Sequence, residues 1–141
     1  MHSRQPFHTE TRRHLQCTGI KTDQFFAEKR IITCKVYHAK VLKGVGNNHS
    51  LPDYAHTKSS IYIKENTNGS FREMRIYDPD DGHVVLEIAY HPEPTLTGNR
   101  TTRILHYHRY DKDLKHGAAK VLTKLSDIYE KYKKYLEAYG L

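Results

Sequence analysis

The chain has 141 residues, enough for one domain with its own hydrophobic core and no need of disulfides or metal for stability. Tyr supplies eleven of the fifteen aromatic residues, so the interior is expected to rely on rings whose hydroxyls reach water or a partner. The net charge of +7 favours an anionic partner such as RNA or a nucleotide, although a lysine-rich soluble surface explains it equally.

The apolar pattern argues against membrane insertion and secretion. There is no run of about eighteen apolar residues, as a membrane span requires. The first residues also lack the apolar core of a signal peptide. Cys17 and Cys34 form no CxxC motif, which favours a reducing compartment. We therefore expect a cytoplasmic protein that makes no membrane contact.

Residues 1–21 are basic and show no sustained apolar periodicity. The segment contains one acidic residue, Glu10, and four basic ones: Arg4, Arg12, Arg13 and Lys21. This composition predicts a flexible arm that contacts phosphates, or simply an unstructured terminus or expression remnant. We expect residues 22–141 to form a single domain.

The central part of the chain is predicted to form mainly β-structure. A short helix is expected near 23–30 and a strand near 31–38, followed by a Gly- and Asn-rich break. Alternating segments then predict a meander of four strands at 59–65, 71–78, 83–91 and 100–110. Asn68-Gly69 and Asp81-Gly82 supply residues that tolerate the positive φ of tight turns.

The C-terminal segment predicts one long amphipathic helix. Asp113 is a plausible N-cap and Gly140 a C-cap, and between them apolar residues recur at steps of three and four: Leu114, Ala118, Val121, Leu125, Ile128, Tyr132, Tyr135 and Tyr139. Such a helix would be about 40 Å long. It is expected to pack on the sheet, with pairing to a second copy of the chain as the alternative.

Together these elements predict an α+β fold. It comprises an antiparallel sheet of four to five strands in a meander, the long C-terminal helix on one face, and the short N-terminal helix.

The two strands around PEPTLTGN carry a candidate site. Because side chains alternate along a strand, Glu87 and His91 should share a face with His106 and His108, opposite the face that meets the helix. That second face is expected to be open. Paired positions lie about 5 Å apart, close enough for these groups to share a ligand.

Three interpretations of this histidine face remain. A histidine could act as acid or base on an RNA 2′-hydroxyl without any metal, with Arg103 or Arg109 steadying the phosphorane. Alternatively, HxH with His91 and Glu87 could bind Zn²⁺, although the leading interpretation includes no metal. Finally, the histidines could be polar residues on a solvated sheet.

A second cluster precedes the first hairpin strand. The loop LPDYAHTKSS offers candidate substrate-binding groups in Asp53, Tyr54, His56, Lys58 and Ser59. The same composition is also that of an ordinary turn.

The run from LPDYAH through FREMRIYDPDDGHVVLEIAYHPEP to ILHYHRYDK resembles toxin-like C-terminal domains of phage head-morphogenesis (minor capsid) proteins. The matching positions are Ser59 or Ser60, Arg72 or Arg75, Tyr77-Asp78, Gly82, Glu87, His91 and His106-Tyr107-His108. The resemblance implies a fold similar to the barnase, EndoU and RelE group of metal-independent ribonucleases.

These observations lead to two functional expectations. The first is a phage-associated, toxin-like protein that binds RNA or a nucleotide and cleaves it with His91, His106, His108 and Glu87. The second is a non-enzymatic module that sequesters a nucleotide or binds a protein against host defence. In either case the C-terminal helix could support a homo-oligomer.

Overall fold

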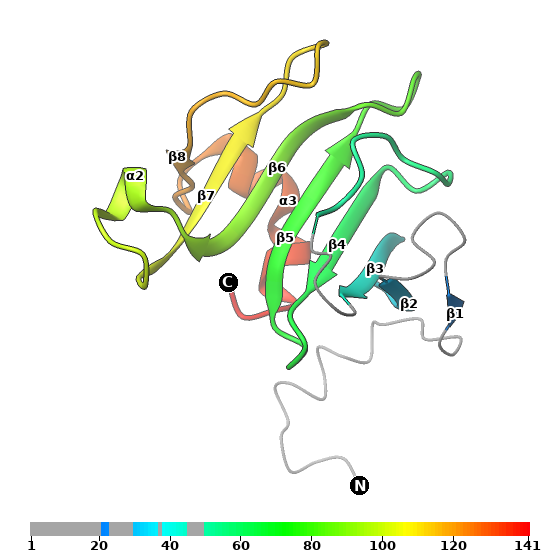
Figure 1. The fold of residues 1–141 in the computed structure, drawn as a ribbon, viewed down its shortest axis with the longest axis horizontal. Coiled ribbons are helices and arrows are strands. Elements are labelled where there is room, and N and C mark those ends of the chain that lie inside the picture. The colour runs from blue at the N-terminus through cyan, green and yellow to red at the C-terminus, as the bar shows by residue number, and fades with distance from the viewer. Residues whose placement is uncertain (1–20, 23–29, 37, 45–49) are drawn as a thin grey trace, which may run out of the picture.

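The computed structural model describes residues 21–22, 30–36, 38–44 and 50–141. The described part is an α+β fold in which a twisted sheet carries one main helix, α3, on one of its faces (Figure 1). A short helix, α2, lies beyond the end of strand β6. The expected α+β class is therefore confirmed.

The sheet of the described residues has eight strands, and their spatial order follows the chain order. Neighbouring strands run antiparallel, except that β3 and β4 are parallel. The expected antiparallel meander of four to five strands is thus wrong as a description of the whole sheet. The strands are β1 (Lys21–Thr22), β2 (Arg30–Val36), β3 (Ala39–Gly44), β4 (Ile61–Glu65), β5 (Phe71–Tyr77), β6 (Val84–Pro92), β7 (Arg103–Arg109) and β8 (Lys120–Val121).

Two tight turns join the strands at the centre of the sheet. Gly69 lies between β4 and β5 with φ of +86°, and Gly82 lies between β5 and β6 with φ of +81°. A side chain at such angles clashes with the backbone, so glycine is favoured at both positions, as the sequence predicted. The β6–β7 connection is longer and includes α2 (Pro94–Thr97).

The C-terminal helix is much shorter than expected. α3 spans Asp127–Glu137, which is eleven residues or about 16 Å, and its N-cap is Ser126 rather than Asp113. The expected helix of about 40 Å is therefore wrong. Gly140 does adopt a positive φ of +81°, two residues beyond the C-cap Ala138.

The segment before α3 pairs with the sheet instead of coiling. Leu114 has φ of +64°, outside the helical region. The amide of Gly117 donates to the carbonyl of Arg109 at 2.7 Å, and the amide of Leu122 donates to the carbonyl of Leu105 at 2.9 Å. These bonds to the β7 side of the sheet occupy backbone groups that a helix would pair internally. Tertiary pairing thus overrides the helical spacing of the apolar residues.

A hydrophobic core fills each side of the sheet. On the α3 side, Ile63, Met74 and Ile88 pack against the buried helix residues Tyr129 and Leu136. On the other side lies a smaller cluster of Leu42, Leu51, Tyr62, Tyr77 and Val84. The loop around Leu51 covers this second face, so the sheet is buried on both sides at its centre.

Two expectations fall largely or wholly outside the described residues: most of the basic arm at 1–21, and the short helix near 23–30, of which only Arg30 is described, as the first residue of β2. Within the described part, no helix is long and apolar enough to cross a membrane.

Candidate functional site

The register of β6 and β7 groups the predicted residues. Glu87 lies opposite His108, and Ala89 lies opposite His106. Directly paired residues project to the same face, and His91 follows Ala89 by two positions. Glu87, His91, His106 and His108 therefore share the face opposite α3, as alternation predicted.

The expectation that this face is open is wrong. Glu87 is 9% exposed and His106 is fully buried. Loop residues Leu51–Asp53 lie over the Glu87 part, where the Leu51 and Pro52 carbonyls accept hydrogen bonds from the β5 residue Arg75. Glu93, at the start of α2, lies beside the histidines. Alternation identified the shared face, but only the packing of the connecting loops determined what covers it.

Glu87 belongs to a buried network, separate from the histidine side chains. Its Oε2 accepts a hydrogen bond of 2.8 Å from Nε of Arg75. The Arg75 guanidinium also donates to Asp53 Oδ1 at 3.1 Å and to the Tyr110 hydroxyl at 3.0 Å. The ion pair with Glu87 raises the pKa of Arg75, against the opposing effect of burial. This satisfied network binds the 51–53 loop to the sheet.

His106 and His108 both have Nε2 on the side of Glu93. Nδ1 of His106 lies 2.8 Å from the Ile104 carbonyl, and Nδ1 of His108 lies 2.9 Å from the Gly117 carbonyl. A carbonyl can only accept, so each Nδ1 carries the proton and donates it. In the neutral rings the lone pair is therefore on Nε2, the nitrogen free to bind a cation.

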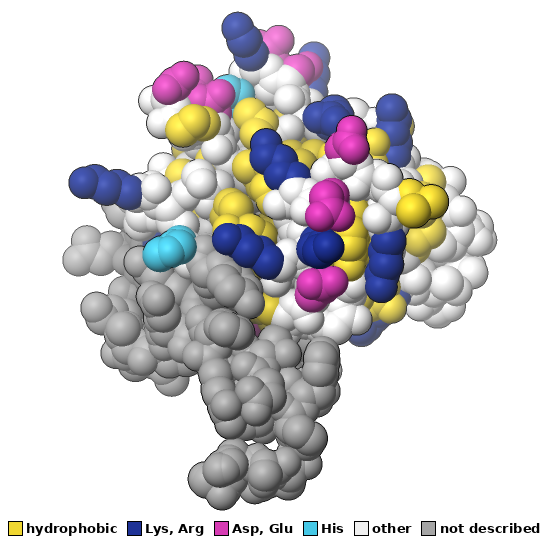
Figure 2. Space-filling model, turned by 180° about the vertical axis from the view of Figure 1, so that it is seen from behind, with side chains coloured by type: hydrophobic (Ala, Val, Ile, Leu, Met, Phe, Trp, Pro, Cys, Tyr) yellow, Lys and Arg dark blue, Asp and Glu magenta, His cyan; other side chains and the backbone are white. Residues whose placement is uncertain are grey.

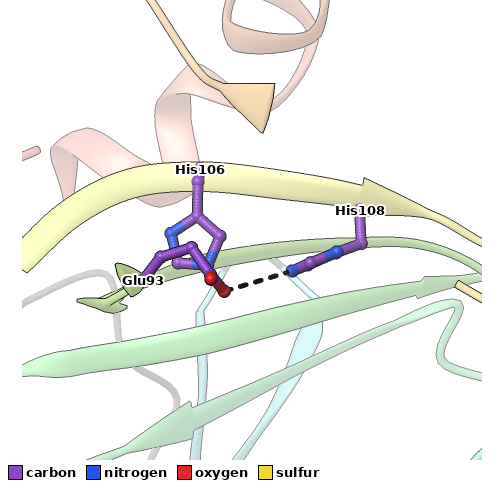
Figure 3. Close-up of side chains that lie close together, drawn as sticks. All are labelled: Glu93, His106 and His108. Atoms are coloured by element: carbon purple, nitrogen blue, oxygen red, sulfur yellow. Dashed lines mark ion pairs between the residues drawn. The ribbon is translucent and has the colours of Figure 1, made fainter. Parts of the chain in front are cut away.

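Glu93 brings a carboxylate to these two nitrogens. Its Oε2 lies 3.9 Å from Nε2 of His106 and 4.0 Å from Nε2 of His108. All three side chains lie on the side of β7 away from α3, with the carboxylate oxygen between the two rings (Figure 3). The separations are too long for hydrogen bonds. The three groups thus converge at ion-pair distance without hydrogen bonds between them.

Local structure fixes the position of Glu93. It is the N-cap of α2, and its Oε1 accepts from the Thr95 hydroxyl at 2.7 Å and from the Thr95 amide at 3.3 Å. These hydrogen bonds, with the nearby histidines, lower the pKa of Glu93 below its usual range, so it is an anion at neutral pH. The sequence interpretation missed Glu93. Its signal was an acid directly before proline at the end of a strand, a typical N-cap position.

His106 carries the unusual atom of the cluster. Among the described residues, its Nε2 is the only buried side-chain nitrogen or oxygen without a hydrogen-bond partner. Burial, together with His91 and His108 nearby, lowers the pKa of His106, so the ring is neutral at pH 7. Leaving a polar atom buried and unpaired costs about 1–3 kcal/mol. Such a lone pair facing a carboxylate is electrostatically unfavourable unless a cation lies between them.

The trio forms a candidate metal centre. The ligand atoms of Glu93, His106 and His108 all lie within 4.8 Å of one another. Zn²⁺ with bonds of about 2.0–2.1 Å holds tetrahedral ligand atoms about 3.3 Å apart. The Glu93 oxygen lies 3.9 and 4.0 Å from the two Nε2 atoms, so each of these two separations would have to shorten by roughly half an ångström to reach that value. The ligand set differs from the expected one, because Glu93 replaces Glu87 and His91.

Two further histidines flank the trio. The ring of His91 packs edge-on against His106 at 4.8 Å, and its Nδ1 donates to the Pro92 carbonyl. The ring of His116 lies 4.8 Å from that of His108. The sequence interpretation did not select His116, because it was placed inside the expected helix.

The predicted substrate-binding loop lies elsewhere. Lys58 and Ser59 line a cavity of about 400 Å³ together with the β5–β6 turn. The Ala55 amide donates to the Gly82 carbonyl, just before β6 begins, whereas Glu93 follows its end. Asp53 bonds Arg75, the His56 amide donates to the Tyr62 hydroxyl, and Tyr54 is 47% exposed. Lys58 and Ser59 therefore lie near the start of β6, away from Glu93, whereas Asp53 joins the network of Glu87.

The predicted phosphate-binding arginines face away from the histidines. Arg103 and Arg109 are both exposed and alternate with His106 and His108 along β7, so they belong to the α3 face. The Arg109 guanidinium lies 5.8 Å from the Tyr107 ring centre. Neither is placed to steady a phosphate beside His106.

The positive charge is unevenly distributed along the chain. Residues 50–141 hold 14 Lys and Arg against 13 Asp and Glu, so residues 1–49 carry +6 of the net +7. On the molecular face that bears α3, cationic and acidic side chains are interspersed (Figure 2). The charge that favoured an anionic partner therefore comes mainly from residues 1–49.

Comparison with protein-family models, curated proteins and solved structures finds no match for this chain. The resemblance to toxin-like domains of phage head-morphogenesis proteins therefore stays a prediction.

Proposed function

We propose that the protein is a zinc-binding protein whose site is formed by Glu93 Oε2, His106 Nε2 and His108 Nε2. The observation that carries this proposal is the fully buried, unpartnered Nε2 of His106, which faces an anionic carboxylate. A divalent cation would satisfy this lone pair and offset the carboxylate charge in one step. Two imidazoles and one carboxylate suit Zn²⁺, a borderline metal ion.

The supporting contacts around the trio match those that usually orient zinc ligands. Each ligand histidine uses its other nitrogen to bond a backbone carbonyl, and Glu93 uses its other oxygen to bond Thr95. Such contacts fix the tautomer and direct the binding atom at the metal. The lowered pKa values of His106 and Glu93 keep both in metal-binding form at pH 7.

Calorimetric titration of chelator-treated protein with Zn²⁺ tests the proposal. We expect one equivalent to bind with an affinity that falls at least tenfold in each of Glu93→Gln, His106→Leu and His108→Gln. The exposed His56 lies near the other end of β6, so His56→Gln is the matched control and should leave this affinity unchanged.

Cobalt provides a second measurement, because Cys17 and Cys34 could also bind metal. Co²⁺ at the proposed site should give visible d–d bands without a sulfur-to-cobalt charge-transfer band, and His108→Gln should remove those bands. Zinc affinity that is equal in wild type and His106→Leu would overturn the proposal. A charge-transfer band at the first equivalent would also overturn it.

The expected RNA or nucleotide ligand remains a prediction, as does the non-enzymatic anti-defence module. Metal-free acid-base cleavage by His106 finds no support in the geometry, because the ring is fully buried and cannot contact a substrate. Filter binding of labelled RNA at low and high salt would test the anionic-ligand expectation separately from zinc.

A further inference from the structure

We propose that the metal site is catalytic, hydrolysing a small uncharged ester or amide in the adjoining cavity, with His116 as the group that accepts the proton of the attacking water. This inference rests on the proposed zinc site.

The number of ligands leaves part of the metal free. Structural zinc sites generally have four protein ligands, whereas catalytic ones have three and keep a position for water or substrate. Among the described residues, the group that meets around Glu93 has three members. Zinc held by the trio would therefore retain a position for water.

A cavity adjoins two of the three proposed ligands. Glu93 and His108 both line a cavity of about 400 Å³, whereas His106 lies buried beneath them. The cavity is bounded on one side by Thr95 and Leu96 of α2 and on the other by the 116–119 segment. Two ligands thus line the cavity, and the third is a buried neighbour of theirs on β7. A metal among them would meet the cavity directly.

The walls favour an uncharged, compact substrate. Apart from the ligands and His116, they consist of Thr95, Leu96, Gly117, Ala118 and Ala119. Among the described residues, the lining includes no Lys or Arg to balance the charges of a polyphosphate or RNA strand. An ester or amide carbonyl needs only the metal to polarise it. The small apolar groups then offer contact to its substituents.

His116 is the proton acceptor of the cavity. It is exposed, and its Nδ1 lies 3.1 Å from the Gly117 carbonyl, so Nδ1 donates and Nε2 of the neutral ring carries the lone pair. Its ring lies 4.8 Å from that of the ligand His108. A neutral imidazole nitrogen can accept a proton from water.

The reaction balances without any redox partner. With a metal bound by the trio, the oxygen of a water in the cavity would bond to the carbonyl carbon while His116 Nε2 would take its proton. The bond from carbon to the leaving oxygen or nitrogen then breaks. His116 returns the proton to the leaving group, so water plus an ester yields an acid and an alcohol, and an amide yields an acid and an amine.

The experiment compares two chromogenic probes on zinc-loaded full-length protein. p-Nitrophenyl acetate is an uncharged ester, and bis(p-nitrophenyl) phosphate is a phosphodiester. We expect multiple turnovers of the ester, little cleavage of the phosphodiester, and loss of ester turnover in chelator-treated protein. Chelator-treated protein also controls for unspecific reaction of surface histidines with the ester.

His116→Ala separates the two proposals. We expect unchanged zinc affinity and an unchanged melting temperature, but a kcat/KM for the ester lower by about 100-fold. Added imidazole should restore part of that rate, which a purely structural role for His116 would not produce. Zinc binding without ester turnover overturns this inference and leaves the zinc site standing.

Failure to bind zinc overturns both proposals. Faster cleavage of the phosphodiester than of the ester overturns the uncharged substrate class. Full activity of His116→Ala overturns the role of His116.

Discussion

Nε of Arg75 on β5 donates a hydrogen bond of 2.8 Å to Oε2 of Glu87 on β6, within an ion pair that is almost fully buried. Glu87 is predicted from the sequence to be catalytic, and in the structure this contact engages its carboxylate in a buried network. The same guanidinium bonds the 51–53 loop, so the pair joins two strands and the covering loop.

Arg75→Met should therefore destabilise the fold strongly. The change leaves Glu87 as a buried charge without its partner and removes the bonds to the loop, which should cost about 3 kcal/mol or more. Urea denaturation followed by circular dichroism measures the change in the free energy of unfolding. Arg100→Met, at an exposed position, is the control and should change it by less than about 0.5 kcal/mol. A loss of similar size in both variants would contradict the structural role of the network.

Glu73→Gln should raise stability at neutral pH. Burial and the neighbouring Glu87 raise the pKa of Glu73 above its ordinary value of 4.5, despite Lys64 and the arginines. The folded state thus binds the proton of the Glu73 carboxyl more tightly than the unfolded chain does. The stability that results is present below pH 4.5 and is lost as the pH rises through the folded pKa of Glu73.

The glutamine variant avoids that loss. It should be more stable than wild type at pH 7, and the difference should shrink as pH falls below about 4.5. Thermal unfolding between pH 3.5 and 8 measures both curves, with the exposed Glu137→Gln as the control. A variant less stable than wild type at pH 7 would mean that attraction to the neighbouring cations stabilises ionised Glu73 more than burial destabilises it.

Ser126→Ala should destabilise α3, whereas Asp113→Ala should not. Ser126 Oγ accepts from the Tyr129 amide at 3.1 Å at the start of the helix, and losing such a cap costs about 1 kcal/mol. Asp113 is exposed and precedes α3 by more than ten residues. Chemical denaturation compares the two variants. A larger effect at Asp113 would favour the long helix expected from the sequence.

Thr95→Val should weaken zinc binding about tenfold, because the hydroxyl that orients Glu93 Oε1 at 2.7 Å is removed without a change of shape. Calorimetric titration with Zn²⁺ gives the ratio of affinities. Thr97→Val is a matched control in the same helix, since its hydroxyl bonds backbone carbonyls instead of the carboxylate. Equal loss in both variants would indicate that α2 itself, and not the Thr95 contact, supports the site.

Alternation and turn chemistry made the central sheet predictable. Each of the four expected strands from 59 to 110 has a counterpart, and both turn glycines adopt positive φ. The shared face of Glu87, His91, His106 and His108 followed from the two-residue period alone. Strand patterns are local, so neighbouring residues suffice to reveal them.

The segment from 113 to 126 was not predictable in this way. Its apolar spacing fits a helix, yet the hydrogen bonds of Gly117 and Leu122 to β7 are contacts between distant residues. The same pairing brings His116 to His108 and closes one wall of the cavity. Because the segment has a helical pattern, the sequence interpretation missed His116 as a residue of the candidate site.

The sequence by itself determined which side chains share a face, because alternation along a strand is a property of the backbone. Only the tertiary structure decided which of them meet. Glu87 binds Arg75 because β5 lies beside β6. Glu93 lies near His106 and His108 because it caps α2, the short helix in the connection from β6 to β7. Burial, which lowers the pKa of His106 and leaves its Nε2 unpaired, likewise arises from loops whose packing no local pattern specifies.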